Sequence, residues 1–217
     1  SNLKKEFSRL KEIEILNSND NNLPFELPST WAWVKLGEVC EINLGKTPTK
    51  ENKGFWDSGK YQWIAIADMV ERGTIFTTQK SVSELAKKIC FKGQIYKKGT
   101  LLLSFKLTIG RTSFMGCDGF FNEAIAAIIP RIYENSEIFK KYLWNLLGTF
   151  TNHAETTGAI KGETLNKEKL QNLPIPLPPL KEQEKIVEVL DELISLASEF
   201  DRIKEELKRI EKRIEKR

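Results

Sequence analysis

The sequence predicts an α+β protein, in which one mixed, strand-rich domain is followed by a long coiled-coil helix. Short apolar stretches broken by glycines fill residues 23–130, four prolines cluster within residues 174–179, and an uninterrupted heptad repeat runs over residues 186–214. These three observations predict three parts. We expect an N-terminal helix and linker (1–22), a globular domain (23–179), and a long helix (180–217) that serves as a coiled-coil dimerisation and spacer region.

Each part has its own local pattern. Residues 3–16 carry apolar side chains at helical spacing before a polar run, which predicts a short helix and a linker. Stretches rich in Val, Ile, Phe and Trp predict short strands over residues 23–130, and apolar residues every four positions predict an amphipathic helix over 137–152. The prolines of residues 173–180 exclude a helix or a central strand, so we expect a stiff extended strut there.

The C-terminal heptads are the clearest pattern in the chain. All their a and d positions are apolar, and no Gly or Pro interrupts them, which strongly predicts a coiled coil. At 1.5 Å per residue the helix would extend ~55 Å, so it cannot cover its own apolar seam. The predicted dimerisation residues are Ile186, Val189, Leu193, Leu196, Phe200, Ile203, Leu207, Ile210 and Ile214.

The first two heptads have a wider apolar face than the later ones. Val187, Leu190 and Ile194 flank the seam there, whereas charged residues hold the equivalent positions farther along. This face could pack against the chain's own domain or against a large partner.

The composition indicates a folded protein of a reducing compartment. Hydrophobic residues make up 40% of the 217, enough for a core of ordinary size. Three widely spaced cysteines and a single histidine have no metal-ligand spacing, so we expect no metal site and a cytoplasmic location. No apolar run approaches the ~20 residues that a membrane helix needs. We therefore expect no membrane association.

Positive charge is concentrated in the globular part. Residues 80–111 contain eight basic residues and one acidic residue, whereas residues 181–217 contain 10 basic and 11 acidic residues. Such a local excess is typical of a surface that meets phosphates, although it also fits a solvated lysine-rich face.

Motifs of catalysis are incomplete. Gly45-Lys46-Thr47 resembles the end of a phosphate-binding loop, but Cys40 occupies the position of its first glycine and Pro48 would break the helix that must follow. The aspartates of the globular part are isolated and form no nuclease-type cluster. We therefore expect a protein that is not an enzyme and has no catalytic residues.

Five segments, in order along the chain, resemble the specificity (S) subunit of type I restriction-modification systems. They are LPSTWAWVKLGE (27–38), GKTP (45–48), KGTLLLSF (98–105), NEAIA (122–126) and LPIPLPPLKEQ (173–183), of which the last is the most specific. Family members usually carry two target-recognition domains and two helical regions, whereas this chain has one of each. It resembles a half-size form, and a natural half-size subunit or a fragment of a longer one both fit.

The resemblance implies a non-catalytic DNA-recognition subunit that directs partner subunits to a bipartite DNA site. Its implied partners are double-stranded DNA, a methyltransferase (M) subunit, a restriction (R) subunit and a second copy of the chain bound through the C-terminal helix. S-adenosylmethionine, ATP and Mg are expected on the partner subunits and no cofactor in this chain. We expect the M subunit to dock on the face around Val187, Leu190 and Ile194. The alternative is a structural coiled-coil adaptor that does not bind DNA.

Residues 23–179 would then be the target-recognition, DNA-binding domain. Lysines would contact phosphates, and polar side chains on loops would read base edges. We expect these contacts from loops at 45–53, 106–111 and 157–161 and from the lysine pair before residue 101. The candidate DNA-binding residues are Lys46, Thr47, Lys50, Lys97, Lys98, Lys106, Thr108, Arg111, Thr157 and Lys161.

Overall fold

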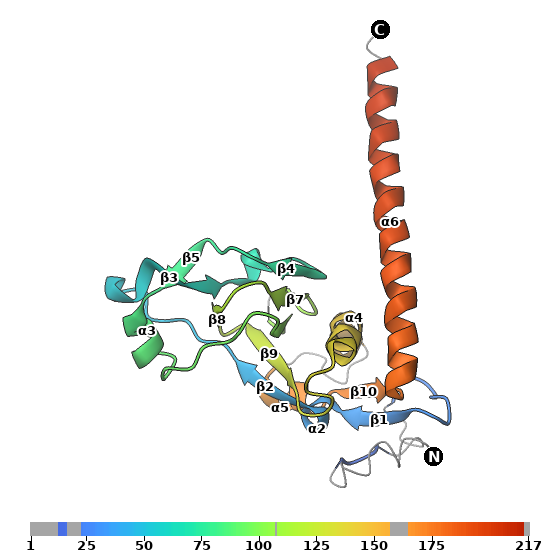
Figure 1. Cartoon of the computed structure of the whole chain (residues 1–217), viewed down its shortest axis with the longest axis horizontal. Helices are drawn as coiled ribbons and strands as arrows, with labels where there is room; N and C mark the ends of the chain where they lie inside the picture. Colours follow the sequence, from blue (N-terminus) through green and yellow to red (C-terminus); the bar gives the residue numbers. More distant parts are fainter. Residues whose placement is uncertain (1–12, 17–22, 107, 157–164, 215–217) are drawn as a thin grey trace.

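The computed structural model describes residues 13–16, 23–106, 108–156 and 165–214, with the side chains of 153–156, 213 and 214 excepted. These residues form a strand-rich domain from which one long helix projects (Figure 1). The α+β fold class is confirmed. Strands within the described residues form sheets in the orders β1-β10, β2-β9-β6-β7-β4 and β5-β3-β8.

The largest sheet has five strands, and it is buried on both faces. Antiparallel ladders join β2 to β9, β9 to β6 and β6 to β7, whereas β4 runs parallel to β7. Because side chains alternate along a strand, Leu101 and Leu103 enter one core cluster and Leu102 enters another on the opposite face. The strands are β2 (Cys40–Leu44), β9 (Ile125–Pro130), β6 (Leu101–Ser104), β7 (Thr112–Met115) and β4 (Gly73–Ile75).

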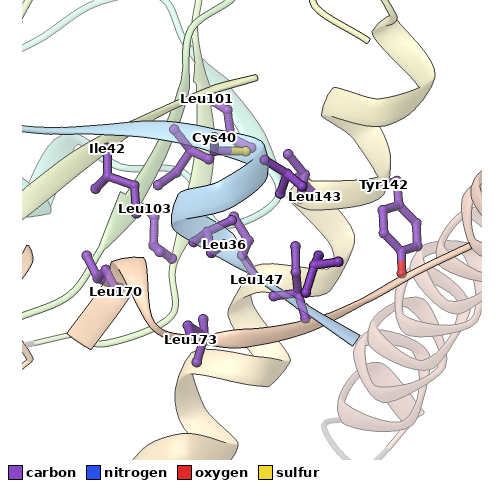
Figure 2. Packing of buried hydrophobic residues seen from close by; sticks show 14 of the residues in the cluster. Leu36, Cys40, Ile42, Leu101, Leu103, Tyr142, Leu143, Leu147, Leu170 and Leu173 are labelled. Atoms are coloured by element: carbon purple, nitrogen blue, oxygen red, sulfur yellow. The ribbon is translucent and has the colours of Figure 1, made fainter. Parts of the chain in front are cut away.

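Helix α4 (Glu137–Thr156) covers one face of this sheet, and it includes the amphipathic helix predicted over residues 137–152. Figure 2 shows Leu143 and Leu147 of α4 beside Leu36, within a core cluster that also contains Leu101 and Leu103. The short helices α2 (Leu36–Val39) and α5 (Lys167–Gln171) add to this cluster.

A three-stranded sheet builds the end of the domain farthest from the long helix (Figure 1). Its own small core contains Phe120, on which the ring of Phe91 stacks with centroids 4.0 Å apart. The elements of this end are β3 (Trp56–Ile64), β5 (Lys80–Val82), β8 (Gly119–Phe121), α3 (Glu84–Ile89) and the 3-10 turns η2 (Lys53–Phe55) and η3 (Ile66–Asp68).

The proline-rich segment is extended, as predicted, and it also pairs with a strand. Strand β10 (Pro174–Leu177) runs antiparallel to β1 (Ala32–Lys35) in a two-stranded sheet. Prolines are tolerated in β10 because it is an edge strand, paired only with β1 among the described strands, and its outer edge needs no N–H donor. The Tyr142 hydroxyl donates a buried hydrogen bond of 2.7 Å to the Pro176 carbonyl and so joins α4 to this sheet.

This bond predicts a modest, measurable contribution to stability. Replacing Tyr142 by Phe leaves the buried Pro176 carbonyl without its donor, so we expect the free energy of unfolding to fall by about 1 kcal/mol. Urea unfolding monitored by circular dichroism measures the change. Tyr96→Phe is the matched control, because within the described residues no hydrogen bond of the Tyr96 hydroxyl is found. An equal loss in both variants would contradict the assignment.

The helix predicted over residues 3–16 is wrong where the structure describes it. Residues 13–16 are not helical: Ile15 forms a bridge with Val34, and the Leu16 amide donates to the Trp33 carbonyl at 2.9 Å. The free edge of β1 offers backbone donors and acceptors that an extended segment satisfies and a helix does not. Residues 1–12 lie outside the described part.

The heptad segment forms α6 (Leu180–Ile214), which extends well beyond the domain (Figure 1). Two hydrogen bonds hold its first turn. The Trp31 indole donates to the Glu182 carboxylate at 2.6 Å, and the buried Gln183 amide donates to the Pro178 carbonyl at 2.8 Å. No helix of the described residues is long and apolar enough to cross a membrane.

The wide apolar face of α6 packs on the chain's own domain. Val187 is 2% exposed within the core cluster that contains residues of α4, and Leu190 and Ile194 are half-buried. An ion pair of 3.2 Å between Lys141 and Asp191 also joins the two helices. The Val187 part of this face is therefore covered by the domain, whereas Leu190 and Ile194 stay partly exposed, and docking of an M subunit there stays a prediction.

The seam itself is open to solvent along most of α6. Seven of the predicted dimerisation residues, from Val189 to Ile210, are between 47% and 66% exposed. Ile186 is half-buried against the domain core, and the side chain of Ile214 lies outside the described residues.

Candidate DNA-binding surface

The loop that follows β2 lies directly on the turn between β8 and β9. The amide of Gly45 donates to the Ile125 carbonyl at 3.0 Å, and that of Lys46 donates to the Phe121 carbonyl at 2.9 Å. A Cβ atom on Gly45 would lie 2.1 Å from the Asn122 carbonyl oxygen. Only glycine allows this approach, so the GKTP turn places the next side chains at a defined position.

Two tryptophans hold the backbone of this loop while its polar side chains stay exposed. The Trp63 indole donates to the Lys46 carbonyl and the Trp56 indole to the Thr49 carbonyl, each at 3.0 Å. The two rings pack edge to face with centroids 5.0 Å apart. Lys46, Thr47 and Lys50 are therefore exposed side chains on a fixed backbone.

Two of the three candidate loops meet at Glu123, which precedes β9. The Thr47 hydroxyl donates to the Glu123 carboxylate. This hydrogen bond holds the pKa of Glu123 below its usual value, and the positive charges of Lys106 and Lys50 add to the effect. The structure thus brings Thr47, Lys50 and Lys106 together around one carboxylate.

The turn at residues 106–111 is anchored against α4. Gly110 has a φ of +83°, and a Cβ there would lie 2.8 Å from the Gly148 carbonyl oxygen. The Arg111 guanidinium points into the domain, where it donates to the Met69 carbonyl at 3.3 Å, and its Nε is buried without a hydrogen-bond partner. Thr108 is exposed and Lys106 is half-exposed.

Lys97 and Lys98 lie at the other end of the sheet. They precede β6, whereas Lys106 follows it, so the length of the strand, at least about 10 Å, separates the two groups. Lys97 forms an ion pair of 2.7 Å with Asp118, and this contact lowers the pKa of the Asp118 carboxyl. The basic run of the sequence is therefore divided between two places.

A groove of about 480 Å³ lies between the end of β2 and the connection after α3. Of its polar residues, only Lys46 is among the predicted DNA-binding residues. Lys92 belongs to the basic run of residues 80–111, and no local pattern in the sequence marks the others. The polar residues of the groove are Asn43, Lys46, Lys92, Gln94 and Lys167.

A second basic depression flanks the same loop. Lys50, Lys53 and Lys80 surround Trp56 in a pocket of about 480 Å³, with the Lys80 amine 5.5 Å from the ring centroid. Thr157 and Lys161 lie outside the described residues, so their role in DNA binding stays a prediction. No group of histidine, cysteine or acidic side chains that could hold a metal ion occurs within the described part of the chain.

The sequence matches a known protein family and several characterised proteins. Residues 28–209 match the family model described as the type I restriction modification DNA specificity domain. The chain is 28% identical over 190 residues to the type I restriction enzyme MjaIX specificity subunit of Methanocaldococcus jannaschii, covering 84% of this chain and 43% of that protein. It is 27% identical over 174 residues to the EcoR124I/EcoR124II specificity subunit of Escherichia coli, covering 76% and 41%.

Solved structures share the fold. The HsdS subunit of Thermoanaerobacter tengcongensis superposes with a TM-score of 0.63 at 24% identity, over 93% of this chain and 46% of that one. A chain from a study of complex assembly and conformational transition of the type I R-M system gives 0.62 at 23% identity, over 92% and 46%. The chain therefore spans less than half the length of these relatives.

Proposed function

Because the chain belongs to the type I restriction-modification DNA specificity family, we propose that it supplies one target-recognition domain and one spacer helix to a complex that reads a bipartite DNA site. The observation that supports this most is the combination of a lysine-bearing domain with an open apolar seam on the helix that leaves it. The domain would bind DNA, and the helix would hold it at a set distance from a second domain.

Recognition would combine phosphate contacts with base contacts. Lysines position a protein on the duplex and make binding salt-dependent, whereas polar side chains in the groove of the DNA discriminate sequence. We propose that the exposed Lys46, Thr47 and Lys50 make such contacts together with Lys106. Lys97, Lys98, Thr108, Arg111, Thr157 and Lys161 stay candidates.

Catalysis would belong to other subunits. We propose that this chain transfers no methyl group and cleaves no DNA, and that it guides an M subunit and an R subunit in the cytoplasm. S-adenosylmethionine, ATP and Mg would be bound there and not by this chain. The M subunit would dock on the part of the wide face of α6 that stays partly exposed, around Leu190 and Ile194.

Self-association through α6 would supply the second recognition domain. An exposed seam of seven large apolar residues is unfavourable in water, and a two-fold dimer is the commonest way to bury it. We propose antiparallel helices with the two domains at opposite ends. Two identical domains arranged this way would read two identical half-sites in inverted orientation.

Methylation assays test the proposal directly. The purified chain alone is expected to transfer no methyl group to plasmid DNA, whereas the chain with its cognate M subunit is expected to methylate one sequence motif with two inverted half-sites. Sequencing of methylated bases in cells that carry both genes identifies the motif. Methylation by the M subunit at the same sites without this chain would refute the proposed role. A chain that shows no salt-dependent mobility shift with DNA would favour the structural adaptor.

A further inference from the structure

We propose that the groove between the end of β2 and the connection after α3 is where the domain holds duplex DNA. In this arrangement Lys46, Lys92 and Lys167 contact phosphates, and Gln94 and Asn43 read base edges. The inference rests on the proposed DNA-recognition function and assigns that function to a place on the domain.

The lining of the groove carries an excess of positive charge. Its three lysines come from three separate parts of the chain, and the nearby Glu41 carboxylate, which is outside the lining, accepts a hydrogen bond from Asn43. Among the described residues none of the three amines forms an ion pair, in contrast to Lys97 with its Asp118 partner. Three cations without ion-pair partners in one groove attract a polyanion and release its condensed counterions.

Both walls of the groove are held in place before any ligand arrives. Lys46 lies on the loop that Trp63 fixes through its carbonyl. On the facing wall, Lys92 and Gly93 have φ values of 52° and 78°, and the Gly93 amide donates to the Lys87 carbonyl at 2.9 Å. Phe91 anchors this turn by stacking on Phe120. The backbone that carries Lys92 is therefore fixed by the turn that ends α3 and by the stacked rings.

The two amides supply the groups that base recognition needs. Gln94 is exposed, and its side chain forms no hydrogen bond within the described residues. Asn43 donates one amide hydrogen to Glu41 at 2.8 Å, which leaves its carbonyl oxygen and its second amide hydrogen available. Side-chain amides pair with adenine through two hydrogen bonds in the major groove. The lysines would therefore set the affinity for DNA, and the side-chain amides would set the sequence preference.

Two native cysteines allow DNA binding at the groove to be distinguished from DNA binding at the Lys97 and Lys98 end of the sheet by chemical labelling. Cys90 immediately precedes the groove residue Phe91 and lies within the field of Lys46, whereas Cys117 adjoins Asp118 and its partner Lys97. Both thiols are partly exposed, while Cys40 is buried. Burial raises the pKa of both reactive thiols, so alkylation is best followed above neutral pH.

The footprint uses the full chain, N-ethylmaleimide and a 30-base-pair duplex at low salt, with peptide mass spectrometry as the readout. We expect the duplex to slow alkylation of Cys90 and to leave that of Cys117 unchanged. Protection of Cys117 alone, equal protection of both thiols, or no protection of Cys90 by a duplex that demonstrably binds would overturn the proposal.

Charge removal gives an independent test by fluorescence anisotropy. Replacing Lys46 and Lys92 by Gln is expected to reduce the slope of log affinity against log salt by about 2, since each phosphate contact contributes about 0.9. Lys181→Gln with Lys185→Gln on α6 removes the same charge from exposed positions outside the groove and is expected to leave the slope unchanged. A loss of slope in a Lys97→Gln, Lys98→Gln variant without one in the groove variant would move the interface to the other end of the sheet.

The reading role of Gln94 is tested on the motif that methylation mapping identifies. Gln94→Ala should reduce the preference for that motif over a one-base-pair variant by about 5-fold to 150-fold, with nonspecific binding unchanged. Full preference in this variant would remove Gln94 from base recognition. Failure of the unmodified chain to bind any duplex would instead refute the proposed function, so the two failures are distinguishable.

Discussion

Replacing Phe200 and Leu207 by Asp is expected to convert a dimer into monomers. These side chains are 66% and 55% exposed on the isolated α6, so their substitution does not disturb the core of the domain. In the proposed dimer they are buried, and each Å² of apolar surface removed from water contributes about 25 cal/mol. A carboxylate in the seam would be desolvated without a partner. Sedimentation velocity at micromolar concentration measures the change in mass.

Loss of the dimer should also abolish tight binding to the bipartite site. Linkage of two domains raises the local concentration of the second, which strengthens binding by about 100-fold to 10,000-fold. The variant should therefore bind the full site no better than a single half-site, with unchanged circular dichroism. Competition with half-site and full-site duplexes distinguishes these outcomes.

A matched control keeps this test specific to the seam. Ser195→Asp with Ser198→Asp adds the same two negative charges at exposed positions outside the a and d series. This control variant should remain dimeric. A clean monomer of the unmodified chain at micromolar concentration would contradict the dimer and favour a fragment of a two-domain subunit.

Gly45→Ala is expected to destabilise the domain by about 3 kcal/mol, the upper part of the range for overpacking. The added methyl would lie 2.1 Å from the Asn122 carbonyl oxygen and 2.3 Å from that of Phe121, and both contacts are with backbone that cannot rotate away. The loop must move, which also displaces Lys46 and Thr47. Urea unfolding and DNA anisotropy at 50 mM salt measure the two effects.

A control variant distinguishes the effect of the close contact at Gly45 from the effect of backbone strain at a glycine. Gly59 has a φ of +69°, and a Cβ there would meet nothing within 4 Å. Gly59→Ala should therefore cost only the left-handed backbone penalty of about 1–2 kcal/mol. If Gly45→Ala proved no more destabilising than Gly59→Ala, the close approach to the β8–β9 turn would not be what requires glycine.

Local pattern was enough to predict three elements of this chain, although it wrongly predicted a helix at residues 13–16. The heptads of residues 186–214 carry their own periodicity, and the prolines before them exclude a helix through missing donors, so both were predictable. The amphipathic helix over 137–152 was predictable for the same reason. In each case the information lies within a window of a few turns. The motifs of the resemblance, read in order, then indicated the family.

Only the tertiary structure decided which of these residues lie together. Lys97 and Lys106 are nine positions apart in the sequence but stand at opposite ends of the sheet, because β6 runs between them. Lys46, Lys92 and Lys167 are far apart in sequence and line one groove. The wide face of α6 could pack on the chain's own domain or on a partner, and the structure packs its Val187 into the domain core. A local pattern fixes which face of a strand is buried, but which strands pair and which helices pack depends on contacts between segments far apart in the sequence.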